Sequence, residues 1–341
     1  MRGSKILLAS FASLLSTTAL AAIAQECKPL NVLMSVAMRP ERGVPTIAVT
    51  IGDASKKLSV NTASVYSALS QPAIKEMNLN TLQARVKLLN NAGQRSDRYV
   101  ILPSLGIGNA KSDDVKFMVR PAPGPMNPND ANLVGVLGPD ILQNYDVDMD
   151  FVAQKLQLIS PDHCEGKVVY WTAPAVAAVP MRLAQDGKAV IFVNLDGKRL
   201  EAVINTGQVN TTMNLDVAED RYKVEVNAPD VQQVGQIGQN ASAKVYRKQF
   251  QTLTFEGVTI NNPEITLVPD EVKALMPNKN RPKTGSLTRG DEVTSRLADL
   301  TLGMATLRRL HVYIAYRERK VYLSQAAPAA GAPEAAASTA Q

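Results

Sequence analysis

Two segments of the chain combine residue types that could bind or act on a ligand. One reads Val60-Asn61-Thr62-Ala63 and the other reads Ile204-Asn205-Thr206-Gly207. Each Asn-Thr pair follows an apolar run, where a strand would end in a turn. An asparagine amide offers an acceptor oxygen and two donor hydrogens, but it cannot take up a proton at ordinary pH. The segments could therefore hold a ligand by hydrogen bonds, whereas the asparagines cannot act as general acids or bases.

The surroundings of the two segments repeat as well. A polar turn precedes each one, Gly52-Asp53-Ala54 in the first half and Asp196-Gly197-Lys198 in the second. A Leu-Gly pair follows each one, within 136–138 and within 301–303. A single Asn-Thr pair would be ordinary turn sequence, because both residues suit turns. Its recurrence in the same order indicates one supersecondary unit that is present twice.

The elements that must position these segments are short strands. Apolar residues alternate with polar ones over stretches of four to eight residues, as in strands with one buried face. Turn sequences such as Asn90-Asn91-Ala92-Gly93 separate them. An all-β class with a few short helices is expected. A helix is predicted over 71–80, and strands over 44–51, 58–60, 85–89, 99–102, 105–108, 115–119, 147–151, 155–158, 189–195, 199–204, within 250–268, and over 310–316 and 320–323.

Other side chains could supply a missing acid or base. Asp53, Asp140 and Asp216 lie within a domain's reach of the repeated segments, but nothing in their spacing favours catalysis. Turn or surface positions are expected for most of them.

A Ser-His-Asp triad would need Ser64 or Ser67 together with His163. His163 lies beside a cysteine and His311 lies in a predicted strand, so packed or partly exposed positions are expected for both. Two histidines and two cysteines form no metal-ligand pattern, and neither a metal nor a cofactor is predicted.

The repeated unit resembles the retropepsin-like aspartyl proteases. That family is marked by two aliphatic residues, Asp-Thr-Gly, and a distal aliphatic-Leu-Gly. The resemblance covers residues 44–160 and 187–324, with Asn61 and Asn205 at the aspartate positions and Ala63 at the first glycine. It implies two tandem retropepsin-like acid-protease β-barrel domains that form a bilobal, pepsin-like pseudo-dimer.

The resemblance also implies roles for these residues. In the family, two carboxylates share a proton in a cleft between the lobes, and they activate water and polarise the peptide carbonyl. Carried over by position, Asn61 and Asn205 occupy these degenerate catalytic sites. Thr62 and Thr206 would hydrogen-bond between the lobes, and Gly207 would permit the tight turn.

Two further segments are expected to form flaps, the hairpins that close over an extended peptide in this family. Gly93 and Gln94 belong to the first, and residues 234–243, with Gly235 and Gly238, belong to the second. The two glycines could instead open a dinucleotide-binding loop, but no apolar strand precedes them and no helix pattern follows.

The N-terminal residues 1–24 have the pattern of a secretory signal peptide. Arg2 and Lys5 precede an apolar stretch, and Ala22-Ile23-Ala24 forms a cleavage site. The apolar stretch is short and diluted by hydroxyl residues, which argues against a membrane helix. The mature chain is therefore expected to be exported, either periplasmic or secreted, and to have no membrane span.

Export bears on the two cysteines, because thiols are oxidised outside the cytosol. Cys27 and Cys164 bracket the first repeat. A disulfide between them is expected, and two unpaired thiols are the alternative. It would constrain the unfolded chain by roughly 4 kcal/mol in the entropic model.

The formal net charge of +6 is modest, and basic and acidic residues are interspersed. No basic stripe is present, so nucleic-acid binding is not expected. The mature chain is predicted to contain two domains, 25–165 and 166–324. An Ala/Pro-rich tail follows at 325–341, and it cannot bury enough apolar surface to fold.

Three functions are compatible with these features. The leading hypothesis is a pseudo-protease, a monomer or homodimer that binds an extended peptide or protein segment by strand addition. A second is an active aspartic endopeptidase, using a non-standard acid or asparagines converted to aspartate after synthesis. A third is a structural envelope protein whose cleft is filled by its own loops.

Overall fold

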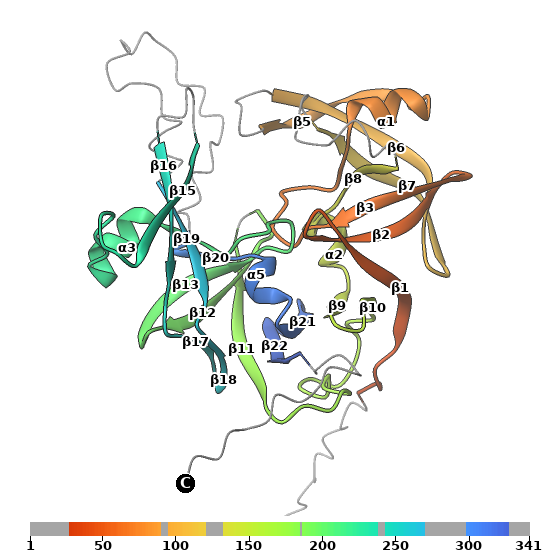
Figure 1. Cartoon of the computed structure of the whole chain (residues 1–341). Coiled ribbons are helices and arrows are strands. Elements are labelled where there is room, and N and C mark those ends of the chain that lie inside the picture. Colours follow the sequence, from red (N-terminus) through yellow and green to blue (C-terminus); the bar gives the residue numbers. More distant parts are fainter. Residues whose placement is uncertain are drawn as a thin grey trace, which may run out of the picture.

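The structure is a computed structural model of the chain, and it describes residues 27–89, 95–120, 132–184, 186–237, 243–269 and 298–326. The predicted signal peptide, the sequence 90–94 and residues 327–341 lie outside this part. The described residues form mostly strands and a few short helices, as predicted (Figure 1). No helix in these ranges is long and apolar enough to span a bilayer.

The first lobe is built from the N-terminal strands. Its ladder includes two parallel pairings, β3 with β8 and β4 with β7, among antiparallel hairpins. Its elements are β1 (Val32–Glu41), β2 (Val44–Ile51), β3 (Ala54–Val60), β4 (Ala68–Leu69), α1 (Gln71–Glu76), β5 (Thr81–Leu89), β6 (Arg95–Ile107), β7 (Ala110–Val119), β8 (Leu133–Leu137) and α2 (Pro139–Leu142).

The second lobe repeats this plan. Its parallel pairings join β13 with β20 and β14 with β19, which correspond to the two parallel pairings of the first lobe. Its elements are β11 (Val176–Leu183), β12 (Ala189–Leu195), β13 (Lys198–Ile204), β14 (Thr212–Asn214), α3 (Leu215–Tyr222), β15 (Val231–Ile237), β16 (Ala243–Gln249), β17 (Thr252–Phe255), β18 (Val258–Asn261), β19 (Glu264–Val268), β20 (Leu300–Leu302) and α5 (Met304–Leu307).

A six-stranded antiparallel sheet joins the lobes, and we call it the central sheet. It adds β9 (Asp146–Asp150), β10 (Lys155–Ile159), β21 (Leu310–Ala315) and β22 (Lys320–Gln325) to the outer ends of β1 and β11. The strand order is β1-β10-β9-β21-β22-β11, so that β9 of the first half pairs directly with β21 of the second. Residue 325, which the sequence analysis placed in the tail, belongs to β22.

Local sequence explains why the strands form and turn where they do. β13 alternates buried and less buried residues, with Leu200, Ala202 and Ile204 in the core. Asp196 and Gly197 both have positive φ, 46° and 75°, as a two-residue hairpin turn requires. A hydrophobic core runs through both lobes and under the central sheet.

Some predicted elements differ in extent. The predicted helix over 71–80 is shorter, because α1 ends at Glu76. The two strands predicted at 99–102 and 105–108 form one continuous strand, β6. The proline at position 103 lacks a donor for the ladder. The ladder accommodates it opposite Asp114, which adopts a φ of 56°.

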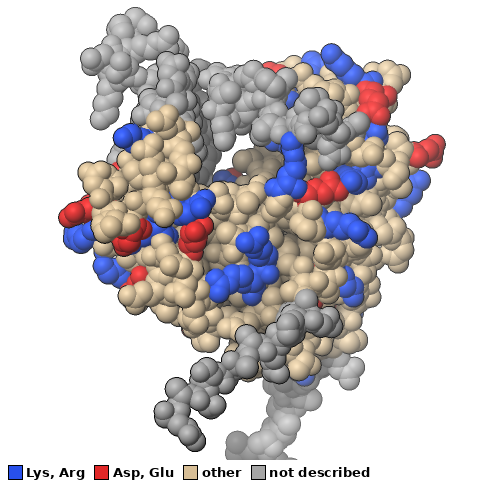
Figure 2. Space-filling model, viewed as in Figure 1, with Lys and Arg blue, Asp and Glu red and all other residues tan. Residues whose placement is uncertain are grey.

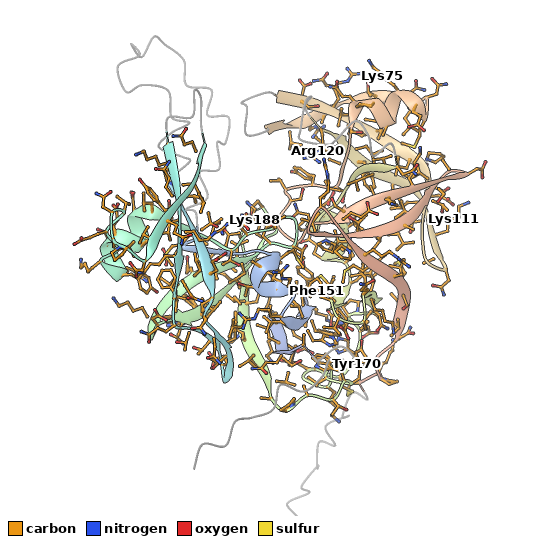
Figure 3. All side chains as sticks on the ribbon, viewed as in Figure 1. Lys75, Lys111, Arg120, Phe151, Tyr170 and Lys188 are labelled. Atoms are coloured by element: carbon orange, nitrogen blue, oxygen red, sulfur yellow. A yellow bond between two sulfur atoms is a disulfide. The ribbon has the colours of Figure 1, made fainter. Side chains whose placement is uncertain are left out.

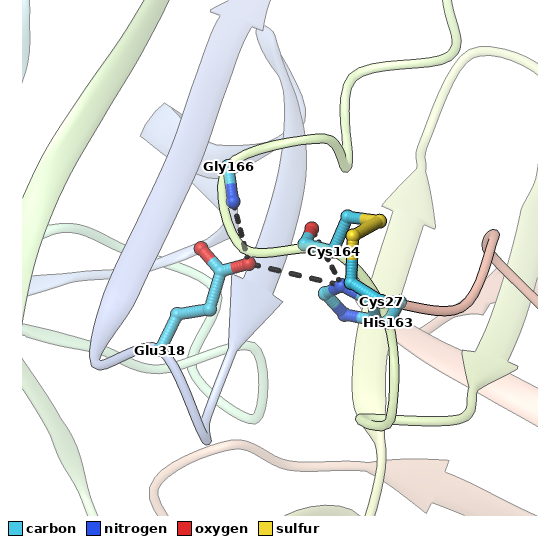
Figure 4. The surroundings of a disulfide bond; sticks show 5 residues. All are labelled: Cys27, His163, Cys164, Gly166 and Glu318. Carbon is cyan, nitrogen blue, oxygen red and sulfur yellow. Dashed lines mark hydrogen bonds and ion pairs between the residues drawn. A yellow bond between two sulfur atoms is a disulfide. The ribbon is translucent and has the colours of Figure 1, made fainter. Parts of the chain in front are cut away.

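The predicted disulfide between Cys27 and Cys164 is present. It ties the N-terminal segment to the linker between the lobes (Figure 4). Glu318 lies beside this linker, where its carboxylate accepts a hydrogen bond from the Gly166 N–H at 2.9 Å. Because the bridge spans 137 residues of sequence, it removes a large loop entropy from the unfolded chain, as the sequence analysis expects.

Candidate functional site

The two Asn-Thr segments form turns at equivalent places in the lobes. Asn61 follows β3, and its N–H donates to the carbonyl of Leu137 at the end of β8 (3.0 Å). Asn205 follows β13, and its N–H donates to the carbonyl of Leu302 at the end of β20 (2.9 Å). The distal Leu-Gly pairs therefore lie beside the turns, and their leucine carbonyls fix the backbone position of each asparagine.

The two turns meet through their threonines, which are fully buried. Thr62 Oγ1 donates to the Ile204 carbonyl at 2.7 Å and accepts from the Thr206 N–H at 3.2 Å. Thr206 Oγ1 donates to the Val60 carbonyl at 2.7 Å and accepts from the Thr62 N–H at 3.1 Å. This symmetrical set of four hydrogen bonds, which we call the threonine grip, joins the lobes at the site.

The asparagine side chains lie on the exposed side of the grip. A Cβ atom built on Gly207 would lie 2.0 Å from Nδ2 of Asn61, so this amide packs directly over the glycine of the other turn. Asn205 Nδ2 instead donates to Oε1 of Gln208 at 3.2 Å. By the two-fold relation between the halves, Ala63 holds the position beside Asn205 that Gly207 holds beside Asn61. The Ala63 methyl group occupies space that a glycine would leave open.

Ala63 does not alter the hydrogen bond that closes its own turn. The Ala63 N–H donates to Oδ1 of Asn61 at 2.9 Å, and the Gly207 N–H donates to Oδ1 of Asn205 at 3.0 Å. Both asparagine oxygens are thus held by the backbone. Each amide can offer only its remaining hydrogen-bonding capacity to a ligand, and neither can move a proton.

The threonine grip leads to a direct prediction about stability. Thr206→Val removes a hydroxyl and leaves the Thr62 N–H and the Val60 carbonyl buried without this partner. Each such group costs about 1–3 kcal/mol, so we expect a loss of about 2–5 kcal/mol in the free energy of unfolding. Chemical denaturation measures it. Thr254→Val, at a partly exposed site in β17, is the control and should change stability by less than about 0.5 kcal/mol; equal effects of the two changes would contradict a role for the grip.

The three aspartates considered as substitutes do not join the asparagines. Asp140 lies in the first turn of α2, where its Oδ1 accepts from both the N–H and the Oγ–H of Ser67, each at 2.7 Å. Burial raises the pKa of Asp140. Asp53 is exposed in the β2–β3 turn, and Asp216 is exposed in the first turn of α3.

The residues that a Ser-His-Asp triad would need are not brought together, in agreement with the sequence analysis. Ser64 Oγ donates to the Tyr66 carbonyl at 2.8 Å, and Ser67 is committed to Asp140. His163 lies instead at the central sheet, where its Nε2 is 2.6 Å from Oδ2 of Asp146. Across the described ranges, no group of three or more His, Cys, Asp or Glu side chains is arranged to hold a metal ion.

Both histidines pair with buried aspartates on the outer face of the central sheet. His311 Nε2 lies 2.5 Å from Oδ1 of Asp148, and the Trp171 ring stacks on the imidazole with centroids 4.1 Å apart. Tyr170 donates to the other oxygen of Asp148. The sequence analysis did not predict these pairs. The linker between the lobes covers the outer face, and the alternation of residues along the strands does not reveal this cover.

Two hairpins stand where flaps were expected. In the first lobe, β5 pairs with β6, and in the second, β15 pairs with β16. Gly235 lies in β15 at a shift of register, with open space around its α-carbon. Gly93, Gln94 and Gly238 lie outside the described residues. Figure 1 shows the two hairpins rising on the same side of the molecule, one from each lobe.

The comparison with known proteins rests on structure. No protein-family model matches the sequence, and no curated protein matches it either. The chain is similar to basic 7S globulin from soybean, with a TM-score of 0.50 and 10% identity, over 89% of this chain and 97% of that one. The chain has the two-lobed, pepsin-like fold. Conglutin gamma, a basic 7S globulin from lupine seeds, gives a TM-score of 0.50 and 11% identity, over 87% of this chain and 95% of that one.

At this identity the likeness concerns the fold alone. It concerns the arrangement of the two lobes, whereas the contact between the two Asn-Thr turns is given by the threonine grip itself. The roles of the individual site residues, and the domain boundaries at 165 and 324, remain predictions.

Proposed function

We propose that this protein is a pseudo-protease, which binds an extended peptide or protein segment between its lobes without cleaving it. The observation that carries the proposal is the pair of amides at the turns, set on an intact threonine grip. The grip preserves the geometry of a two-turn site, while the amides remove its ability to transfer protons.

The shape of the molecule supports the same proposal. Figure 2 shows a recess between the two lobes on the face in view. Lys and Arg side chains are spread over this face with Asp and Glu between them, so no single-sign stripe favours nucleic acid. A chain bound in the recess would lie between the two hairpins, whose strands β5 and β15 each pair on one side only among the described strands. Such edges can add a strand of ligand.

The disulfide supports an exported location for this binding protein, because such bonds persist mainly in oxidising compartments. The proposal places the protein in the periplasm or outside the cell. The segment 1–24 would direct it there.

Peptide binding with site mapping tests the function. We expect peptides from an unfolded protein to bind the natural chain, and to slow amide exchange at both turns and both hairpins. Asn61→Ala with Asn205→Ala should weaken binding, whereas Asn194→Ala, an exposed site in β12, should leave it unchanged. Protection confined to other surfaces, or no binding, would count against the proposal.

Two measurements separate the proposal from an active endopeptidase. Intact mass would reveal each conversion of asparagine to aspartate as a gain of about one dalton, since OH replaces NH₂. Incubation with denatured protein at acid pH would reveal cleavage. We expect an unchanged mass and no cleavage.

A further inference from the structure

One face of the first lobe forms a small apolar cluster apart from the main core. Its buried members are Ala68, Ala84, Met118 and Val136, and Tyr66 and Tyr99 pack against them. Strand alternation explains the separation, because the intervening residues of β7 and β8 point into the main core. We call this cluster the first-lobe face.

The first-lobe face lies between the hairpin and the Asn61 turn. Ala84 comes from β5 and Tyr99 from β6, the strands of the hairpin. Val136 pairs with Ala68 and precedes Leu137, whose carbonyl accepts the Asn61 N–H. A chain lying between the hairpin and the turn would therefore pass along this face.

Two cations flank the apolar residues. Lys116 and Arg120 lie two residues on either side of Met118, and alternation along an extended strand puts all three on one face. Lys116 is exposed, and its Nζ lies 4.1 Å from the centre of the Tyr99 ring. Arg120 is half-buried, and Figure 3 places it on the side of the first lobe that faces the second.

The Arg120 guanidinium has no carboxylate partner among the described residues. Its backbone N–H donates to the Leu69 carbonyl, at the end of the sheet ladder. Two carboxylates of the same lobe have other partners, since Asp140 accepts from Ser67 and Asp97 accepts from Gln83 at 2.9 Å. Burial lowers the pKa of Arg120, because water is removed from the charge without an opposite charge to replace it.

We infer that Arg120 binds a carboxylate of the peptide held between the lobes, next to an apolar or aromatic side chain that packs on the partly exposed rings of Tyr66 and Tyr99, which cover the buried residues of the first-lobe face. This inference rests on the proposed function and specifies its ligand. The planar guanidinium matches a carboxylate with two parallel hydrogen bonds, and a partly dehydrated site strengthens them. Lys116 adds positive charge at the other end of the face. The carboxylate is either an Asp or Glu side chain or the free C-terminus of the peptide.

Selection from random octapeptides tests the inference and separates the two sources. One library carries amidated C-termini and the other carries free carboxylates, and bound peptides are sequenced from both. A side-chain contact predicts enrichment of Asp or Glu by about tenfold at a fixed spacing from an apolar residue in the amidated library. A C-terminal contact predicts binding from the free-acid library alone.

Variants assign the effect to Arg120. Arg120→Met should abolish the preference for a carboxylate while apolar selection persists, and Arg120→Lys should retain only part of it, since a lysine cannot form the fork. Arg98→Met is the matched control, because Arg98 is exposed in the same lobe and bonded to Thr81.

The possible failures differ. Peptides selected without any acidic preference, or a preference that survives in Arg120→Met, would overturn the role of Arg120 and leave the proposed function standing. An absence of binding from both libraries would overturn the proposed function and this inference together.

Discussion

The triple variant Asn61→Asp, Asn205→Asp, Ala63→Gly is expected to cleave denatured protein at acid pH. Its rate should exceed that of the natural chain by at least about 10²-fold, the typical contribution of a positioned general base. The turns already meet through the threonine grip, and Asn61 already packs over Gly207. Two aspartates placed there would repel each other, so that one keeps a proton while the other activates water.

Because of Ala63, we expect the triple, double and single aspartate variants to differ in peptidase activity. By the two-fold relation between the halves, the Ala63 methyl group is expected beside Asn205, whose amide donates to Gln208. The double aspartate variant without Ala63→Gly should therefore be less active than the triple variant. Each single aspartate variant should remain inactive, because a shared proton needs two carboxylates. A folded triple variant with no turnover at any acid pH would show that the turns are not close to a working dyad.

Asp146→Ala is expected to destabilise the fold by about 3–5 kcal/mol, the usual cost of breaking a buried charged pair. Asp146 is fully buried, and its Oδ2 accepts from His163 at 2.6 Å and from the Tyr313 hydroxyl at 3.0 Å. The variant leaves both donors without this partner. Asp162→Ala is the control, since Asp162 is exposed and bonded to Lys28, and it should cost less than about 1 kcal/mol. Denaturation at neutral pH compares them, and equal losses would contradict the importance of the pair.

The same cluster should make stability depend on pH. Burial raises the pKa of Asp146. Burial is the largest single influence on His163 and acts to lower its pKa. The hydrogen bonds with Asp146 and the Cys164 carbonyl and the nearby charges of Asp146 and Glu318 together outweigh burial, so the pKa of His163 is raised. A group with a raised pKa in the folded state stabilises it in the protonated form. The contribution of His163 is therefore complete below its unfolded value of 6.5 and is lost as the pH rises through the folded pKa.

Denaturation between about pH 6 and pH 9 measures this effect in the natural chain and in His163→Gln. The free energy of unfolding should fall with rising pH in the natural chain, by about 1.4 kcal/mol for each unit by which the pKa is raised. The fall should be smaller in His163→Gln. An identical slope in both proteins would assign the pH dependence to other groups.

The repeated turns explain why much of the fold could be predicted from the sequence. Asn61 and Asn205 each sit in a local pattern of strand, turn and distal Leu-Gly, and local patterns survive in sequence. The pairing of Asp146 with His163 has no such pattern. Asp146 and Asp148 alternate with Val147 and Met149, which reads as a strand with one solvated face, because periodicity does not reveal that a distant linker covers it.

Arg120 was missed for a similar reason. An arginine at the end of a strand is ordinary on a surface, and only its burial and its lack of a carboxylate partner among the described residues set it apart. The length of β6 depended on tertiary context too, since a proline favours a strand end unless the facing strand can adapt.

Because β9 pairs with β21, the central sheet is complete only when both halves of the chain are present. A half produced by itself would present one of these strands as a bare edge, open to like copies of itself, and it should self-associate or aggregate. Two complementary fragments mixed together would instead offer each other the missing neighbour. The natural protein can thus be expected to tolerate a nick between its halves far better than the loss of either one.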